Sequence, residues 1–352
     1  MTAAQRKKTM KYLGKSGARA TGAARLCSAL ALLTAIVAHA EDVATQSLHQ
    51  SMDDAWWTGP LLAASASTLP QGHFLVEPYL YDVITYGRYD TQGRRVSTPH
   101  ENDFGSQSYL LYGLTNQVSI GLIPRFGFEK ASQGPSSSNV QVGDLSFQAQ
   151  YRLTQFQEGH WVPTTSIVLA ETFPTGKYDR LEEHPADGFG AGAYSTAVSL
   201  YSQEYFWLST GRILRTRLDL TYTFSNKVSL EGVSVYGTGA GFSGRASPGD
   251  SFTADSSWEY SVTRNWVLAL DVVYQHNANT SVVGNYATDG GDNPSSYAIQ
   301  ENSGTSRSLG FAPAIEYNWS PKIGIIVGAR LIPIGNNTGI SITPVAAINM
   351  VF

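Results

Sequence analysis

Charged residues recur at every second position within otherwise apolar stretches of this sequence. Arg215, Arg217 and Asp219 share one phase of residues 214–224, and leucine or aromatic residues dominate the other phase. Side chains at every second position of a β-strand point to the same face. Acids and bases gathered on one face could pair and brace a wall, or they could line a polar path for a solute. The sequence leaves both roles open.

The same phase rule collects twelve charged residues from several such stretches. We predict that all of them project into one interior space, the lumen of a β-barrel. They are Arg125, Glu129, Asp144, Arg152, Arg215, Arg217, Asp219, Asp255, Glu259, Asp271, Glu316 and Arg330.

Three other motif searches give no evidence for a phosphate, metal or catalytic site. Residues 239–244 match the pattern GxGxxG, but a phosphate site needs a strand before the motif and a helix after it, and a Pro/Gly turn follows here. Glu182, Glu183 and His184 lack a second ligand cluster at useful spacing. The sequence has no GxSxG nucleophile motif. We therefore predict no catalytic residue, no metal, no cofactor and no enzymatic activity.

The composition of the 352-residue chain excludes several classes of protein. Charged residues make up only 15%, against about 25% in ordinary soluble domains, and aromatic residues make up 11%. Abundant aromatic residues exclude a disordered chain, and a single cysteine excludes a disulfide scaffold. The 28 acidic residues argue against nucleic-acid binding. A mean hydropathy of −0.16 excludes a bundle of membrane helices.

Long stretches of period-two alternation indicate strands that cross a membrane. They run for about ten residues, as tilted membrane strands require, and their polar phase is rich in Gly, Ala, Ser and Thr, as in a lumen. We predict an all-β, antiparallel up-and-down transmembrane barrel of about twelve strands, or fourteen if residues 227–236 add one strand and a split of residues 192–210 adds another. The twelve strands are residues 73–87, 107–114, 117–129, 142–154, 162–173, 192–206, 212–224, 251–262, 266–276, 307–319, 323–333 and 341–352.

The connections between these strands alternate between short and long. Long connections fall at residues 88–106, 131–139, 174–191, 225–250 and 278–305. Outer-membrane barrels have short periplasmic turns and longer outer loops, with aromatic girdles at the interfaces. Aromatic residues stand beside the short turns, which predicts a periplasmic girdle of Tyr112, Trp161, Trp207, Trp266 and Trp319.

The first 72 residues differ from the rest of the chain. Residues 1–40 carry seven basic residues and no acid, and an apolar run at residues 26–38 precedes a small-x-small cleavage pattern. This arrangement predicts a signal peptide. Residues 41–72 do not alternate, and they could cap the periplasmic mouth, enter the lumen or form a loose leader. The barrel is predicted to occupy residues 73–352.

The chain ends with apolar residues at every second position back from Phe352. This pattern resembles the C-terminal strand signal of outer-membrane proteins. We therefore predict that Phe352 is part of the signal read by the barrel-assembly machinery, in the outer membrane of a Gram-negative bacterium.

Short motifs in order along the chain resemble one family. They occur at residues 72–79, 113–115, 143–145, 173–176, 259–261 and 265–271, and include Phe173-Pro174-Thr175-Gly176. Together they are similar to the family of the MetA pathway of phenol degradation, whose members are transporter-like outer-membrane proteins. The resemblance covers about residues 60–352. It implies uptake of aromatic or other hydrophobic compounds, and it supplies no site residues.

These observations predict a passive, non-catalytic channel for small hydrophobic or aromatic solutes. Its expected partners are outer-membrane lipid, the assembly machinery and a small-molecule solute, with no nucleic acid. One alternative is a closed structural barrel whose outer loops contact partners, and a less favoured one is a barrel enzyme. A lumen of this strand number fills with side chains or encloses one small solute, so a wide pore is not expected.

Overall fold

The computed structural model describes residues 49–288 and 295–352. The predicted signal peptide therefore lies outside the described residues. The structure contains strands and two short 3-10 helices, η1 (Met52–Asp54) and η2 (Pro185–Asp187). The strands are β1 (Phe74–Tyr89), β2 (Arg95–Thr115), β3 (Val118–Ile123), β4 (Arg125–Lys130), β5 (Gln141–Val142), β6 (Leu145–Thr154), β7 (Thr164–Phe173), β8 (Ser195–Trp207), β9 (Ile213–Ser225), β10 (Val228–Glu231), β11 (Phe242–Ser247), β12 (Ser251–Ser261), β13 (Trp266–Asn277), β14 (Ser281–Thr288), β15 (Ser295–Asn302), β16 (Ser306–Ser320), β17 (Ile323–Asn336) and β18 (Thr338–Val351).

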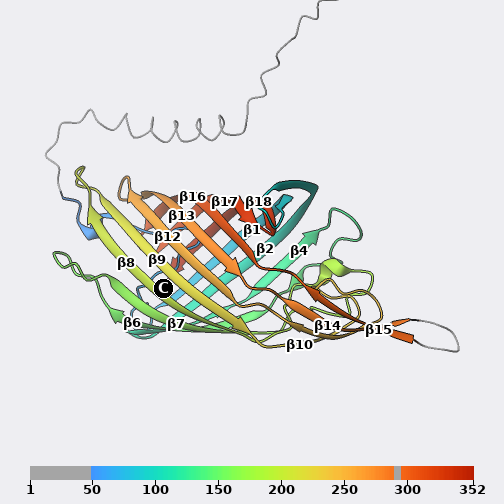
Figure 1. The fold of residues 1–352 in the computed structure, drawn as a ribbon. Coiled ribbons are helices and arrows are strands. Elements are labelled where there is room, and N and C mark those ends of the chain that lie inside the picture. The colour runs from blue at the N-terminus through green and yellow to red at the C-terminus, as the bar shows by residue number, and fades with distance from the viewer. Residues whose placement is uncertain (1–48, 289–294) are drawn as a thin grey trace, which may run out of the picture. The chain divides into compact units, whose positions relative to one another are not determined.

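The main sheet closes into a barrel. β1 pairs antiparallel with β18 on one side and with β2 on the other, so the first and last strands meet. Pro124 separates β3 from β4, and residues 143–144 separate β5 from β6, so each pair forms one interrupted barrel strand. Over the described residues the barrel thus has 12 strands, as predicted. Figure 1 shows them lying obliquely side by side.

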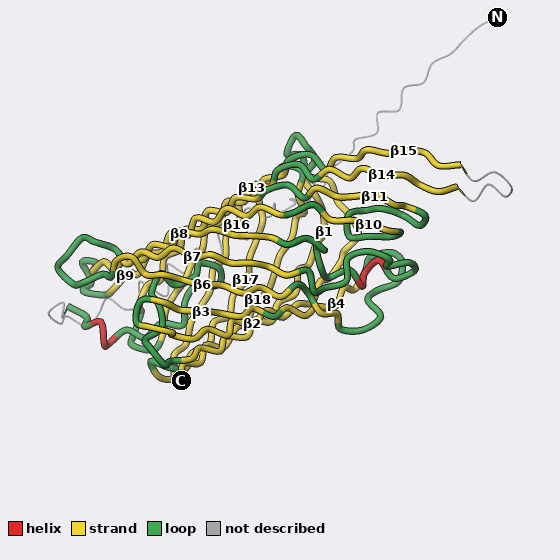
Figure 2. Tube along the Cα trace, turned by 90° about the horizontal axis from the view of Figure 1, so that it is seen from below, coloured by secondary structure: helices red, strands yellow, loops and turns green. Residues whose placement is uncertain are grey.

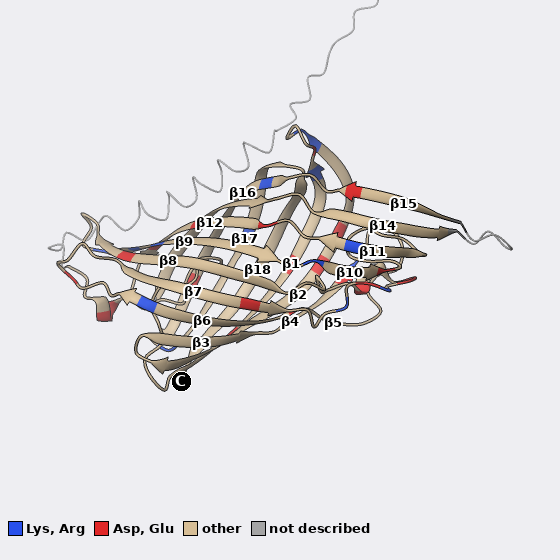
Figure 3. Ribbon diagram, turned by 60° about the horizontal axis from the view of Figure 1, so that its bottom comes forward, with Lys and Arg blue, Asp and Glu red and all other residues tan. Residues whose placement is uncertain are grey.

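Alternating side chains build the two faces of the barrel wall. On β9, Arg217 is 6% exposed, whereas the next residue, Leu218, is 45% exposed. The same contrast separates Phe147, which is exposed, from Ser146, which is buried. Apolar side chains on the outer face suit lipid, and few charged positions interrupt the strands in Figure 3. No helix among the described residues is long and apolar enough to span a membrane.

Two of the predicted long loops contain a second sheet. β10, β11, β14 and β15 pair antiparallel in that order, and Figure 2 shows β14 and β15 reaching beyond the barrel strands. Leu230, Phe242 and Val282 form their apolar core. The fourteen-strand alternative was therefore wrong, because Val228–Glu231 pairs with β11 and not with a barrel strand.

The predicted loop at residues 88–106 is also mostly strand. β2 begins at Arg95 and stays paired with β1, with a register shift between Thr85 and Gly87. Only the turn at residues 90–94 connects the two strands. This extension carries polar residues on both faces, so its sequence shows no period-two alternation.

Four of the five predicted girdle residues are exposed: Tyr112, Trp161, Trp266 and Trp319. Trp207 is the exception. Its ring stacks on His49 with the centroids 4.6 Å apart, and its Nε1 donates a hydrogen bond to the Gln50 carbonyl at 2.8 Å. Trp207 thus holds the start of the described N-terminal segment at the barrel rim.

Candidate functional site

A buried ionic cluster occupies the barrel interior near the short turns. Arg215 on β9 and Glu259 on β12 lie directly opposite each other and form a bidentate ion pair. Arg217 places Nε 3.2 Å from the same carboxylate. The Trp57 ring lies over the Arg215 guanidinium at 4.5 Å. Because burial of a lone charge is strongly unfavourable, each member of this cluster depends on the others.

Residues 49–72 begin at the barrel rim, and their middle part, residues 55–69, lies inside the barrel; we call residues 49–72 the lumen segment. Glu316 on β16 accepts hydrogen bonds from the amides of Thr58 at 2.7 Å and Gly59 at 3.1 Å. Asp271 on β13 accepts from the amides of Leu61 and Ala63, both at 3.1 Å. Asp219 on β9 also accepts a hydrogen bond from the Ala64 amide at 2.6 Å. Carboxylates from three strands of the barrel wall therefore hold one stretch of the segment's backbone.

The lumen segment is also bonded to the opposite wall. Gln150 on β6 donates to the Ser65 carbonyl at 2.9 Å, and the Ser166 hydroxyl on β7 donates to the Ala66 carbonyl at 2.5 Å. The Leu69 amide donates to the Ser119 hydroxyl on β3 at 2.8 Å. The segment thus crosses the barrel interior from β16 to β3.

Apolar packing adds to these hydrogen bonds. Leu61 is 3% exposed and lies in a cluster with Ala312, Ile326 and Ala347, against Tyr79 and Tyr81. Glycines on β17 make room for this packing: a Cβ on Gly324 would lie 2.1 Å from the Thr58 hydroxyl, and one on Gly328 would lie 2.7 Å from Leu61 Cδ1.

The predicted lumen residues fall into two groups by burial. Arg152 and Arg330 are half-buried and Arg125 is exposed, while Glu129 lines an outer cavity. Eight are buried: Asp144, Arg215, Arg217, Asp219, Asp255, Glu259, Asp271 and Glu316. That any of these residues line a solute path stays a prediction.

Asp144 binds a loop at the outer end of the barrel. Its two carboxylate oxygens accept hydrogen bonds from the amides of Gly176 at 2.9 Å and Ala191 at 2.7 Å. The same loop carries Phe189, whose ring lies against Gly127 of β4, because a Cβ there would be 2.0 Å from the ring. The loop therefore bends over the barrel mouth and places an aromatic ring against the inner wall.

A cavity of about 510 Å³, here called the outer cavity, lies beneath this loop. Its walls include Tyr81 from β1, Phe189 and Tyr236 from the loops, and the carboxylates of Asp103 and Glu129. Burial and the nearby Asp144 and Tyr178 groups raise the pKa of Tyr236 to about 12. The Tyr236 phenol is therefore neutral at physiological pH, and it donates a hydrogen bond to the Ala191 carbonyl at 2.7 Å.

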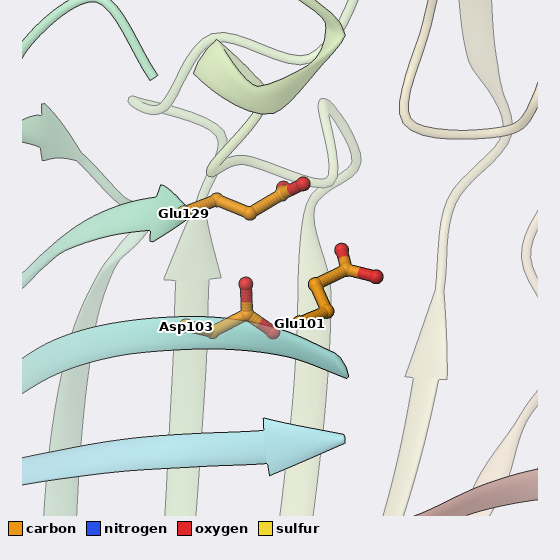
Figure 4. Close-up of side chains that lie close together, drawn as sticks. All are labelled: Glu101, Asp103 and Glu129. Carbon is orange, nitrogen blue, oxygen red and sulfur yellow. The ribbon is translucent and has the colours of Figure 1, made fainter. Parts of the chain in front are cut away.

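Glu101, Asp103 and Glu129 bring carboxylate oxygens within 4.8 Å of one another (Figure 4), and the last two of these residues line the outer cavity. In the described part of the chain, no other group of acidic, His or Cys side chains has this metal-binding geometry. The prediction of no metal did not consider this group, because Glu101 and Asp103 fell in a predicted loop.

Sequence reasoning also missed the aromatic walls of the outer cavity. Phe189 and Tyr236 lie in long connections, where no periodic pattern marks a residue that turns inward. Glycines at strand positions that face the lumen were the one sequence feature that could have indicated these walls. Gly105 and Gly127 occupy lumen-facing strand positions where Tyr81 and Phe189 approach the backbone.

A closed antiparallel barrel with an apolar outer face and an ionic interior defines an outer-membrane β-barrel protein of a Gram-negative bacterium. Residues 83–331 match the model of the family described as "Putative MetA-pathway of phenol degradation". The chain belongs to this family.

A solved channel structure has a similar fold. The chain is similar to an outer membrane channel from Pseudomonas putida F1, with 16% identity and a TM-score of 0.61, covering 82% of this chain and 98% of that one. The beta domain of the Bordetella autotransporter BrkA is more distant, with 8% identity and a TM-score of 0.43, covering 80% and 100%. The Ralstonia pickettii toluene transporter TbuX has 9% identity and a TM-score of 0.36, covering 86% and 96%. No curated protein matches the sequence.

Proposed function

We propose that this protein is a passive outer-membrane channel for small hydrophobic or aromatic compounds, and that it has no catalytic activity. The observation that carries the proposal is the outer cavity. Tyr81, Phe189 and Tyr236 gather there at the outer end of a membrane barrel. Its volume of about 510 Å³ lies within the usual range for small-molecule sites. Membership of a family named for phenol degradation agrees with an aromatic solute.

The lumen segment is the closure of this channel in our proposal. Hydrogen bonds from its backbone amides to Glu316, Asp271 and Ser119 hold it across the interior, on the way from the outer cavity to the periplasm. A solute can pass only when part of the segment moves.

Uptake by whole cells tests the proposal, since hydrophobic solutes cross simple lipid vesicles unaided. Initial rates are measured for a panel of labelled aromatic compounds at low concentration, in cells with the gene, without it, and with it restored on a plasmid. We expect slower uptake of at least one compound in the deletion strain and recovery on restoration. Equal rates for every compound in all three strains would overturn the proposal.

A closed structural barrel is the second candidate. The observation that favours it is the attachment of the lumen segment to both walls, through Asp271 on one side and Ser166 on the other. It predicts that locking the lumen segment in place changes neither uptake nor outer-membrane integrity. The same uptake assay therefore separates the two candidates.

A further inference from the structure

We propose that the outer cavity is a selective site for an aromatic solute that carries a positive charge, such as an arylalkylammonium ion. We also propose that Phe189 sets the width of this site. The inference rests on the proposed channel function and adds the chemical class of one of its solutes.

The aromatic walls are fixed by close contacts with glycine. A Cβ on Gly105 would lie 2.2 Å from the Tyr81 ring, and one on Gly127 would lie 2.0 Å from the Phe189 ring. Each ring thus rests on bare backbone, and a larger residue beneath it would push it into the cavity. The third ring, Tyr236, is held by its hydrogen bond to the Ala191 carbonyl. Aromatic rings that line a cavity attract an organic cation where it can reach their faces.

The loop that carries Phe189 is anchored at several points. Asp144 binds the amides of Gly176 and Ala191, which lie on the two sides of Phe189 in the chain. Asp187 accepts hydrogen bonds from the Ser138 amide at 2.7 Å and the Ser138 hydroxyl at 2.8 Å. The aromatic wall is therefore preformed, which lowers the entropy lost when a ligand binds.

The charge of the outer cavity is negative. Asp103 and Glu129 line it, and no Lys, Arg or His of residues 49–288 and 295–352 lies within ion-pair distance of either carboxylate. Arg125 faces the lumen four positions before Glu129, a spacing of about 13 Å along a strand, and it does not line the cavity. Burial and the neighbouring acidic side chains raise the pKa of Asp103 to about 6 and the pKa of Glu129 to about 7. Above pH 7 the two carboxylates beside three rings favour an ammonium group and disfavour a carboxylate on the same aromatic solute.

The test compares phenethyltrimethylammonium with 2-phenylethanesulfonate at pH 8 in liposomes that contain the purified protein. Both ions carry one phenyl ring and a permanent charge, so neither crosses lipid in a neutral form, and the flux through protein-free liposomes is subtracted. We expect the cation to permeate at least fivefold faster at low salt, with a ratio near one in 1 M salt because exposed charges are then screened. The triple variant Glu101→Gln/Asp103→Asn/Glu129→Gln, which removes all three neighbouring carboxylates, should show a ratio near one at low salt. The control Glu301→Gln, an exposed acid on β15 outside the cavity, should keep the wild-type ratio.

Size selection is tested separately with a naphthylalkylammonium ion. Phe189→Ala should raise its flux at least threefold, and Phe189→Tyr should not. Equal flux of the two phenyl ions, or faster flux of the anion, in the wild type would overturn the charge inference and leave the channel proposal standing. If neither ion crosses and the cells show no aromatic uptake, both proposals are wrong. Heat-modifiability on gels confirms that each variant is folded.

Discussion

The Asp271 carboxylate accepts a hydrogen bond from the Leu61 amide at 3.1 Å, although the two residues lie 210 positions apart in the chain. Its other oxygen accepts from the Ala63 amide. Asp271 is one of the predicted lumen residues, for which the sequence leaves open a bracing role or a place on a solute path. In the structure its carboxylate binds the lumen segment. The interior charges on β9, β13 and β16 share this arrangement, since Asp219 and Glu316 also bind its amides.

Asp271→Ala should loosen the lumen segment. Two buried amides lose their acceptor, and each unsatisfied group is unfavourable by about 1–3 kcal/mol. Hydrogen exchange at Leu61 and Ala63 should become at least tenfold faster, with a larger leak conductance in planar bilayers. Asp255→Ala is the control, because in the described structure Asp255 accepts no hydrogen bond from the lumen segment. Similar exchange rates in both variants would show that Asp271 does not hold the segment.

Glu259→Gln should destabilise the whole barrel. The change leaves the buried guanidinium groups of Arg215 and Arg217 without their carboxylate, and loss of one partner of a buried pair is unfavourable by about 3–5 kcal/mol. Urea unfolding followed by tryptophan fluorescence measures the effect. Arg94→Gln, in the exposed pair with Asp90, is the control and should change stability little. A wild-type urea midpoint for Glu259→Gln would show that its ion pairs with Arg215 and Arg217 do not stabilise the barrel.

The phase of β9 is tested by placing arginine on each face. Leu220→Arg puts a charge toward lipid, which is unfavourable by about 2–4 kcal/mol near mid-bilayer. Thr221→Arg puts it toward the interior, where water and polar side chains are available. The order of urea midpoints should be wild type, then Thr221→Arg, then Leu220→Arg. A lower midpoint for Thr221→Arg than for Leu220→Arg would mean that the faces are inverted.

The outer loop should open in acid. Burial raises the pKa of Asp187, but hydrogen bonds from the Ser138 amide and hydroxyl lower it by more, so the pKa lies below the ordinary value of 3.8. Asp187 therefore stabilises the loop above pH 3.8, and this contribution disappears as the pH falls through the lowered pKa. Pepsin cleavage near η2 should increase over that range in the wild type. Asp187→Asn should be cleaved readily throughout it, and equal resistance in both proteins would contradict the anchor.

Phe352 remains the predicted assembly signal. Its backbone is paired with Phe74, the first residue of β1, at 2.8 Å and 3.2 Å, where the barrel closes, and its side chain is exposed. Deletion of Phe352 should lower the amount of folded protein in outer membranes at least fivefold, with Phe352→Tyr close to wild type. Normal assembly of the deletion would mean that the machinery reads another segment.

Much of the barrel could be predicted because lipid and lumen impose opposite demands on neighbouring residues. The twelve strands and the interior phase of Arg215, Arg217 and Asp219 follow from that contrast. The outer part of β2 carries polar residues on both faces and shows no such pattern. The sheet of β10, β11, β14 and β15 does bury one face, around Leu230, Phe242 and Val282, but its strands are short and lie within the predicted long loops. The lumen segment is held mainly through its backbone groups, which every residue type carries. Its sequence therefore could not distinguish a cap on the periplasmic mouth, entry into the lumen and a loose leader.

A reversible lock on the lumen segment tests the channel proposal most directly. A Cβ on Gly324 would lie 2.1 Å from the Thr58 hydroxyl, so cysteines at these positions are close enough for a disulfide. The one native cysteine, Cys27, falls in the predicted signal peptide. In cells that carry Thr58→Cys/Gly324→Cys, we predict that aromatic uptake falls to the rate of the deletion strain under oxidising conditions and recovers with a reductant, while uptake in each single variant is the same under oxidising and reducing conditions. Undiminished uptake with the disulfide formed would contradict the proposal that the lumen segment closes the channel.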